Sequence, residues 1–201
     1  MIRFGFDQTN FRHVRIKGMR RVFAHPHIFL LGEGIADFPN TLKIASLSVE
    51  PAPPDVGLVV AAFEVALDDS QREAFLRREP EYKIDTTPFY ALDDYGEGAE
   101  ALGEGVICLA SEDEDVEDLA RPDGIETIWN WPRDSGLLPF SMYLRHCLLA
   151  VEKAGGSAHD SFLNDTYLVD RKTTIAKYLE KHGEEVMSSL PPEHLANRFS
   201  G

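Results

Sequence analysis

The sequence predicts an α+β fold, in which a small and mostly antiparallel sheet or barrel is followed by C-terminal helices. Short apolar or alternating runs, typical of strands, fill the first two thirds of the chain, and a single helical segment interrupts them. After that, apolar residues recur at helical steps of three and four. We expect one compact domain, with a sheet core at 1–135, helices packed on it at 136–183 and a peripheral tail at 184–201.

The composition is that of an acidic globular protein. Thirty-four acidic residues against 20 Lys and Arg give a formal net charge of -14, which disfavours nucleic acid and anionic membranes as partners. No apolar run is long enough to span a bilayer, and no signal-peptide pattern is present. Cys108 and Cys147 have no metal-type spacing, so we expect free, buried thiols and a reducing, cytoplasmic compartment. The oligomeric state stays open.

The N-terminal part of the chain predicts four strands. The first is expected at 1–4 and the second at 11–23, where Gly18 marks a bulge or a close backbone approach. The third, at 41–50, ends at a proline cluster, and the fourth, an apolar run at 56–65, follows it. We expect these last two strands to pair antiparallel across the proline-rich turn.

A short helix follows these strands. It is predicted at 68–78, with Asp68 or Asp69 as its N-cap. Pro80 ends it, because the residue before a proline is pushed out of the helical region.

Glu79 is thereby placed at the end of this helix, where the dipole is negative and a carboxylate is not favoured. If Glu79 is also partly buried, its pKa should rise, as a general base near neutral pH requires. The alternative is a solvated residue beside Arg77 and Arg78. The sequence leaves both interpretations open.

The middle of the chain returns to strand patterns. A strand is predicted at 82–90, where Pro88 indicates an edge position, and another at 105–110. The acidic, glycine-rich segment 93–104 should be a surface loop. The acidic run 111–118 lacks the glycine and distal glutamate of an EF-hand, so we expect a solvated loop or helix start there.

Histidine and tryptophan side chains offer further candidates. His13, His25 and His27 leave a metal enzyme as a further hypothesis, which their spacing does not favour, because His25-Pro26-His27 splits two imidazoles around a proline and offers no helical spacing. Trp129 and Trp131 lie in a proline-bounded turn, where they either cover an edge of the core or form the wall of a ligand pocket.

The C-terminal part predicts three helices. Pro139 suits the first turn of the first helix and Gly155 its end. A short helix is expected at 158–163. Asp170 is expected to cap the third helix and Gly183 to end it.

Several short motifs, taken together and in order, resemble those of the gamma-glutamylcyclotransferase-like family. They are Phe4-Gly5, residues 17–23, residues 44–49, residues 55–57 with 63–65, Arg78-Glu79 followed by Tyr82, and Tyr143-Leu144 with Gly155 and Phe162-Leu163. The resemblance spans residues 4–179, and it is the ordered set rather than any one motif that carries it.

The resemblance implies an enzyme that cyclises gamma-glutamyl groups without metal or organic cofactor. The α-amine of a small gamma-glutamyl substrate, such as glutathione, attacks the side-chain carbonyl and releases 5-oxoproline and an amine or amino acid. Glu79 matches the carboxylate that serves first as base and then as acid. Tyr82 would orient the substrate through its hydroxyl, although a core tyrosine is an equal alternative.

The resemblance also implies a substrate-binding loop at Phe4, Gly5, Phe6 and Asp7, whose backbone N–H groups would hold the substrate carboxylate or the developing oxyanion. The family usually has Ser and then Asn or Leu after the glycine, where this chain has Phe6 and Asp7. Asp7 would repel an anionic group unless it pairs with the substrate ammonium. A second hypothesis is therefore an inactive family member that binds a small amino-acid-like ligand or a protein partner.

Overall fold

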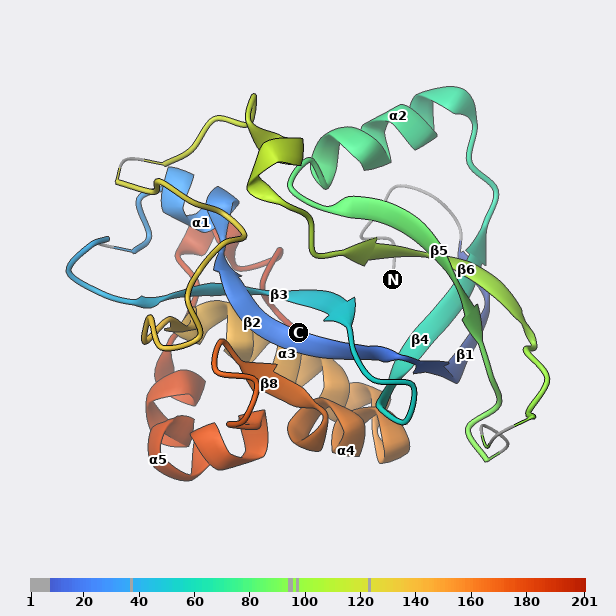
Figure 1. Cartoon of the computed structure of the whole chain (residues 1–201). Helices are drawn as coiled ribbons and strands as arrows, with labels where there is room; N and C mark the ends of the chain where they lie inside the picture. The colour runs from blue at the N-terminus through green and yellow to red at the C-terminus, as the bar shows by residue number, and fades with distance from the viewer. Residues whose placement is uncertain (1–7, 37, 94–95, 97, 123) are drawn as a thin grey trace.

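The computed structural model describes residues 8–36, 38–93, 96, 98–122 and 124–201. The expected first strand and the loop of Phe4, Gly5, Phe6 and Asp7 lie outside these residues. Figure 1 shows strands at the centre, helices α3, α4 and α5 along one side of them, and α2 on the opposite side. The predicted α+β class is confirmed.

The strands form two sheets. β1 (Gln8–Lys17) and β4 (Gly57–Val65) form an antiparallel pair. The larger sheet has the order β5 (Lys83–Phe89), β6 (Gly103–Leu109), β3 (Lys43–Pro51), β2 (Met19–Pro26) and β8 (Thr166–Leu168), with β7 (Leu138–Pro139) also on β3. The expected mostly antiparallel sheet is wrong in part, because β6, β7 and β8 add parallel pairs. Over the described residues the sheets do not close into a barrel, and one bridge, Arg15 to Tyr90, joins them.

Gly18 separates two strands where the sequence predicted one strand at 11–23. Its φ of +65° is a left-handed conformation that glycine adopts without a steric penalty. The Gly18 N–H donates to the Val56 carbonyl oxygen at 2.7 Å, and the Ala52 N–H donates to the Gly18 carbonyl oxygen at 2.8 Å. The corner at Gly18 therefore contacts the proline-rich turn, and the chain changes sheet at both places.

The same arrangement corrects the expected pairing of 41–50 with 56–65. Both segments form strands, as predicted, but β3 pairs with β2 and β4 pairs with β1. Each of these strands thus finds its partner in the segment 8–26 rather than across the prolines.

A buried arginine ties the two sheets to the helices. One amino group of Arg21, on β2, donates to the Val59 carbonyl oxygen of β4 at 3.2 Å, and the other donates to the Ser161 hydroxyl of α4 (Gly156–Asn164) at 2.9 Å. Burial lowers the pKa of Arg21 to about 10, so the guanidinium stays charged at neutral pH.

The C-terminal helices are α3 (Ser141–Ala154), α4 and α5 (Ile175–Ser188). The N-cap of α5 is Thr174, whose hydroxyl accepts from the Lys177 N–H. Asp170 was the predicted cap, but its carboxylate accepts the backbone N–H groups of the preceding turn instead. Gly183 does not end α5, which continues to Ser188 because the buried Val186 follows it on the inner face.

The expected peripheral tail at 184–201 packs against the body of the protein. Leu195, in the short 3₁₀ helix Glu193–Leu195, and Phe199 are both buried. They share a small core with Leu30 of α1 (Ile28–Gly32) and with Phe140. Among the described helices, none is long and apolar enough to cross a membrane.

Candidate functional site

Helix α2 (Asp69–Arg78) positions Glu79 as the sequence predicted. The Asp68 carboxylate accepts the Gln71 N–H at 2.8 Å, and the Gln71 side chain accepts the Asp68 N–H at 3.0 Å, which completes a capping box. Glu79 is the C-cap, with φ −117° and ψ 47°, immediately before Pro80. Local signals therefore fix both ends of the helix.

The Glu79 carboxylate is half-buried, with 27% of its side chain exposed, and its Oε1 lies 3.5 Å from Nε of Arg78. Burial raises the pKa of Glu79, while the positive charges of Arg78 and Arg198 oppose that rise and do not cancel it. The condition for a general base, a carboxylate partly removed from water, is met at this position.

A second carboxylate and a thiol share the surroundings of Glu79. Burial raises the pKa of Glu81, and the negative charge of Glu79 raises it further. Burial, together with both carboxylates, raises the pKa of the Cys108 thiol on β6 to about 11. Cys108 is a free thiol, as expected, but it is only partly buried, whereas Cys147 is free and buried as predicted. The Cys108 thiol stays protonated at neutral pH.

The Tyr82 hydroxyl is engaged by the protein itself. It donates to the Leu47 carbonyl oxygen at 3.1 Å and lies 3.2 Å from Nε2 of His25. Because its single proton goes to Leu47, His25 is the donor in the second bond. The Tyr82 N–H closes the turn on the Glu79 carbonyl oxygen at 3.2 Å. This geometry favours Tyr82 as an anchor for the backbone of Glu79 over the expected role in orienting substrate.

An aromatic cluster backs this anchor. The rings of His25 and Trp129 stack with centroids 4.2 Å apart, and Trp129 meets Tyr82 edge-on at 5.6 Å. Trp129 thus forms a wall beside the turn that carries Glu79, while Trp131 packs against the main core next to Phe38.

Asp113 holds the Trp129 loop in place. Its carboxylate accepts the N–H groups of Ile128 at 2.7 Å and of Trp129 and Asn130 at 3.3 Å, and also the Thr127 hydroxyl. Partial burial raises the pKa of Asp113, but these bonds together outweigh it and lower the pKa below its usual value. The acidic run around Asp113 was expected to be a solvated loop or a helix start, and it contains the short 3₁₀ helix Asp113–Val116. Sequence reasoning missed the role of Asp113 in holding the Trp129 loop, because the run itself offers no local signal for it.

The buried histidines on β2 and just after it are neutral. Burial lowers the pKa values of His25 and His27 to about 3 each. His13 lies apart, on β1. Among the described residues, no group of three or more His, Cys, Asp and Glu side chains is arranged to hold a metal ion.

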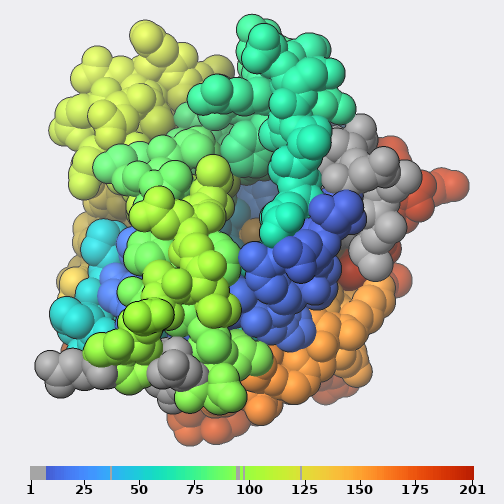
Figure 2. All heavy atoms as spheres, turned by 90° about the vertical axis from the view of Figure 1, so that its right-hand side faces the viewer, coloured from blue at the N-terminus to red at the C-terminus, as the bar shows by residue number. Residues whose placement is uncertain are grey.

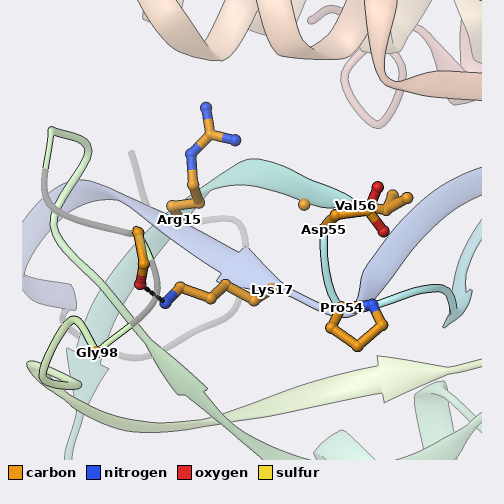
Figure 3. A pocket seen from close by; sticks show the side chains of 8 residues that line it. Arg15, Lys17, Pro54, Asp55, Val56 and Gly98 are labelled. Carbon is orange, nitrogen blue, oxygen red and sulfur yellow. Dashed lines mark hydrogen bonds between the residues drawn. The ribbon is translucent and has the colours of Figure 1, made fainter.

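Glu79 lines neither of two surface pockets. Figure 2 shows a hollow on the face where β1 and β4 approach β5 and β6, beneath α2. Figure 3 shows a pocket at the C-terminal end of β1. Its volume is about 560 Å³, and it is lined by Arg15, Lys17, Pro54, Asp55, Val56, Gly57, Gly96 and Gly98. Lys17 is already bonded there to the Gly96 carbonyl oxygen at 2.9 Å. The other pocket is lined by Asp113, Glu114, Glu117 and Arg121.

The structure thus brings Glu79, Tyr82 and unpredicted neighbours together, whereas Phe4, Gly5, Phe6 and Asp7 lie outside the described residues. Comparison with protein-family models, with curated proteins and with solved structures gives no match for this chain.

Proposed function

We propose that this protein is a gamma-glutamylcyclotransferase-like enzyme that converts a small gamma-glutamyl substrate into 5-oxoproline and an amine or amino acid. Glu79 is the catalytic residue of this proposal. The observation that carries it is the half-buried carboxylate at a helix end, whose burial raises its pKa despite two neighbouring arginines. The ordered sequence motifs supply the reaction class, and the geometry at Glu79 supplies a base suited to it.

In this reaction Glu79 shuttles two protons from the attacking nitrogen to the departing one. Its carboxylate accepts the first proton from the substrate α-ammonium, and the free amine attacks the γ-carbonyl carbon to form the ring C–N bond. The protonated Glu79 donates that proton to the departing nitrogen as the original amide C–N bond breaks. The regenerated carboxylate then takes the second proton from the ring nitrogen and passes it to the released amine, which leaves as its ammonium ion. The net reaction consumes no water and needs no oxidant, reductant or cofactor.

Tyr82 supports the role of Glu79 as a base by anchoring the turn that carries it. Its bonds to Leu47 and His25 fix the turn, so the backbone of Glu79 is held in place relative to β3 and β2. A base held in this way avoids the entropic cost of being ordered in each turnover.

The second candidate function is an inactive relative that binds a small amino-acid-like ligand or a protein partner. One observation favours it: the Arg78 guanidinium lies 3.5 Å from the Glu79 carboxylate, and an ion-paired carboxylate is a weaker base.

The test is product identification. Purified protein is incubated with glutathione, several gamma-glutamyl amino acids and gamma-glutamyl amines, and 5-oxoproline is quantified by mass spectrometry. The enzyme hypothesis predicts release from at least one compound. Binding of a panel member without any release would favour the second candidate.

A further inference from the structure

The outer edge of β4, on the side away from β1, is open over residues 61–65. The backbone groups of alternate residues in a strand point to the same edge. The Val59 N–H donates to the Ser161 hydroxyl at 2.9 Å, and the Val59 carbonyl oxygen accepts from Arg21 at 3.2 Å, so the odd-numbered residues of β4 face away from β1. Among the described residues, no group bonds to the backbone of residues 61, 63 and 65 on this edge.

The other edge strands have features that discourage pairing with a further strand. In the larger sheet, β8 has only three residues and β5 contains Pro88, which has no N–H to donate. In the smaller sheet, β1 has a bulge between Thr9 and Arg12. Residues 61–65 contain no proline, lysine or bulge. This part of β4 is therefore an unprotected template for another strand.

The side chains along this edge are apolar. Phe63 is 38% exposed and Val65 36%, and Phe11, which the bulge of β1 places opposite Phe63, is 62% exposed. Glu64 is the one charged residue within 61–65, and its carboxylate already lies 3.3 Å from the Arg12 guanidinium. The strand that fits this edge is therefore apolar and without a charge of its own to pair.

A second copy of β4 meets this requirement. Antiparallel pairing about a two-fold axis at Phe63 sets Ala61 opposite Val65 of the partner subunit, and Phe63 opposite Phe63 of the partner subunit. All of these residues have their backbone groups on the open edge, so each pair can exchange both of its N–H to carbonyl bonds. Glu64 then lies opposite Ala62 of the partner subunit, which keeps the two carboxylates apart.

Other registers are less suitable. An axis at Glu64 would set the two carboxylates directly opposite each other, which destabilises a pair of strands. An axis at Ala62 would need the edge at Val59, which Ser161 and Arg21 already occupy. The contacts along β4 therefore select the axis at Phe63.

We propose that the protein forms a symmetric dimer in which β4 pairs antiparallel with β4 of a second copy around Phe63. The two small sheets then become one sheet of four strands, in the order β1, β4, β4 and β1. A two-fold interface of this kind uses the same surface on both copies and closes on itself, so assembly stops at the dimer. The proposal is independent of the reaction assigned to Glu79.

The dimer should be weak and should tighten as salt is added. Its contact is one short strand with a few apolar side chains, which corresponds to a Kd on the order of 10 μM. Each copy has a formal net charge of -14, so the copies repel each other until salt screens the charge. A dimer held by ion pairs between the copies would weaken with salt instead, and that result would contradict the proposal.

The first experiment is sedimentation equilibrium of the full chain from about 1 μM to about 1 mM. Phe63→Lys sets two ammonium groups opposite each other at the axis, and should raise the Kd at least about a hundredfold. The matched control is Val106→Lys, the same kind of change at an exposed position on β6, which should keep the wild-type Kd. A wild type that stays monomeric throughout, a Phe63→Lys variant that dimerises normally, or particles larger than a dimer would overturn the proposal.

A second experiment tests the register without weakening the contact. Phe63→Cys should form a disulfide between two copies under mild oxidation, because residues opposite each other in such a pair have Cα atoms about 5.5 Å apart. Val106→Cys should not cross-link, and the wild type sets the baseline because it keeps the free Cys108 and Cys147. A Phe63→Cys variant that cross-links no faster than Val106→Cys would show that β4 does not pair with itself at Phe63.

Discussion

Lowering the pH from 7 to 5 should destabilise the fold, because two buried imidazoles must stay neutral. Burial lowers the pKa values of His25 and His27 from 6.5 to about 3. The unfolded chain therefore binds more protons than the folded chain between pH 6.5 and pH 3. Stability contributed by the neutral rings is complete above pH 6.5 and is lost as the pH falls through that window.

The magnitude follows from the same values. At pH 5 each imidazole should cost about 2 kcal/mol of unfolding free energy relative to pH 7, and the pair about 4 kcal/mol. Glu79 and Glu81 act in the opposite direction, since raised pKa values let the folded state take up protons first. The loss of unfolding free energy between pH 7 and pH 5 should therefore be compared between variants, because the loss in the wild type alone combines both effects.

The assay is urea unfolding, followed by tryptophan fluorescence, at pH 7 and pH 5. His27→Phe removes one titrating ring from an aromatic cluster that already contains Tyr143 and Phe140. The loss of unfolding free energy between pH 7 and pH 5 should therefore be smaller by about 2 kcal/mol. The control is His194→Gln, because the ion pair of His194 with Glu33 is exposed and therefore weak, so the loss should stay close to that of the wild type. A folded His27→Phe variant with an undiminished loss would refute the reasoning.

Three further predictions concern single contacts. Arg78→Gln removes a charge that lowers the pKa of Glu79, so the acid limb of kcat/KM for 5-oxoproline release should move to higher pH; an unmoved limb would mean that another group titrates. Asp113→Ala removes the acceptor of three backbone N–H groups, which should cost about 2 kcal/mol in urea unfolding and shift Trp129 emission to the red. Unchanged emission would show that Asp113 does not hold the loop. Gly18→Ala should lower the free energy of unfolding by about 1 kcal/mol, because φ is +65° and only the backbone conformation opposes a Cβ there. An unchanged free energy in the same urea assay would contradict the left-handed conformation of Gly18.

Local signals in the sequence predicted the structure correctly where it depends on residues that are close to one another in the chain. The Asp68 cap, the Pro80 stop and the placement of Glu79 between them all involve residues within a few positions of one another. The sequence could not predict whether Glu79 is partly buried, because its burial depends on side chains from distant parts of the chain.

The sequence pattern did not predict contacts between residues that are far apart in the chain. Gly18 was recognised as special, yet whether it bends one strand or separates two depends on the turn at Ala52 and Val56. The tail residue Phe199 is buried only because α1 and α3 lie beneath it. The Asp113 contacts reach 14 to 17 residues along the chain, beyond any local motif.

The most direct test of the central claim is the rate of 5-oxoproline release by wild type and Glu79→Gln, measured on the best compound of the substrate panel. The swap keeps the shape of the side chain and removes the base. The control is Glu73→Gln, an exposed position on the same helix. We predict a loss of at least about a hundredfold in kcat for Glu79→Gln, the usual contribution of a general base, and full activity for Glu73→Gln. A folded Glu79→Gln variant that turns over at the wild-type rate would contradict the account.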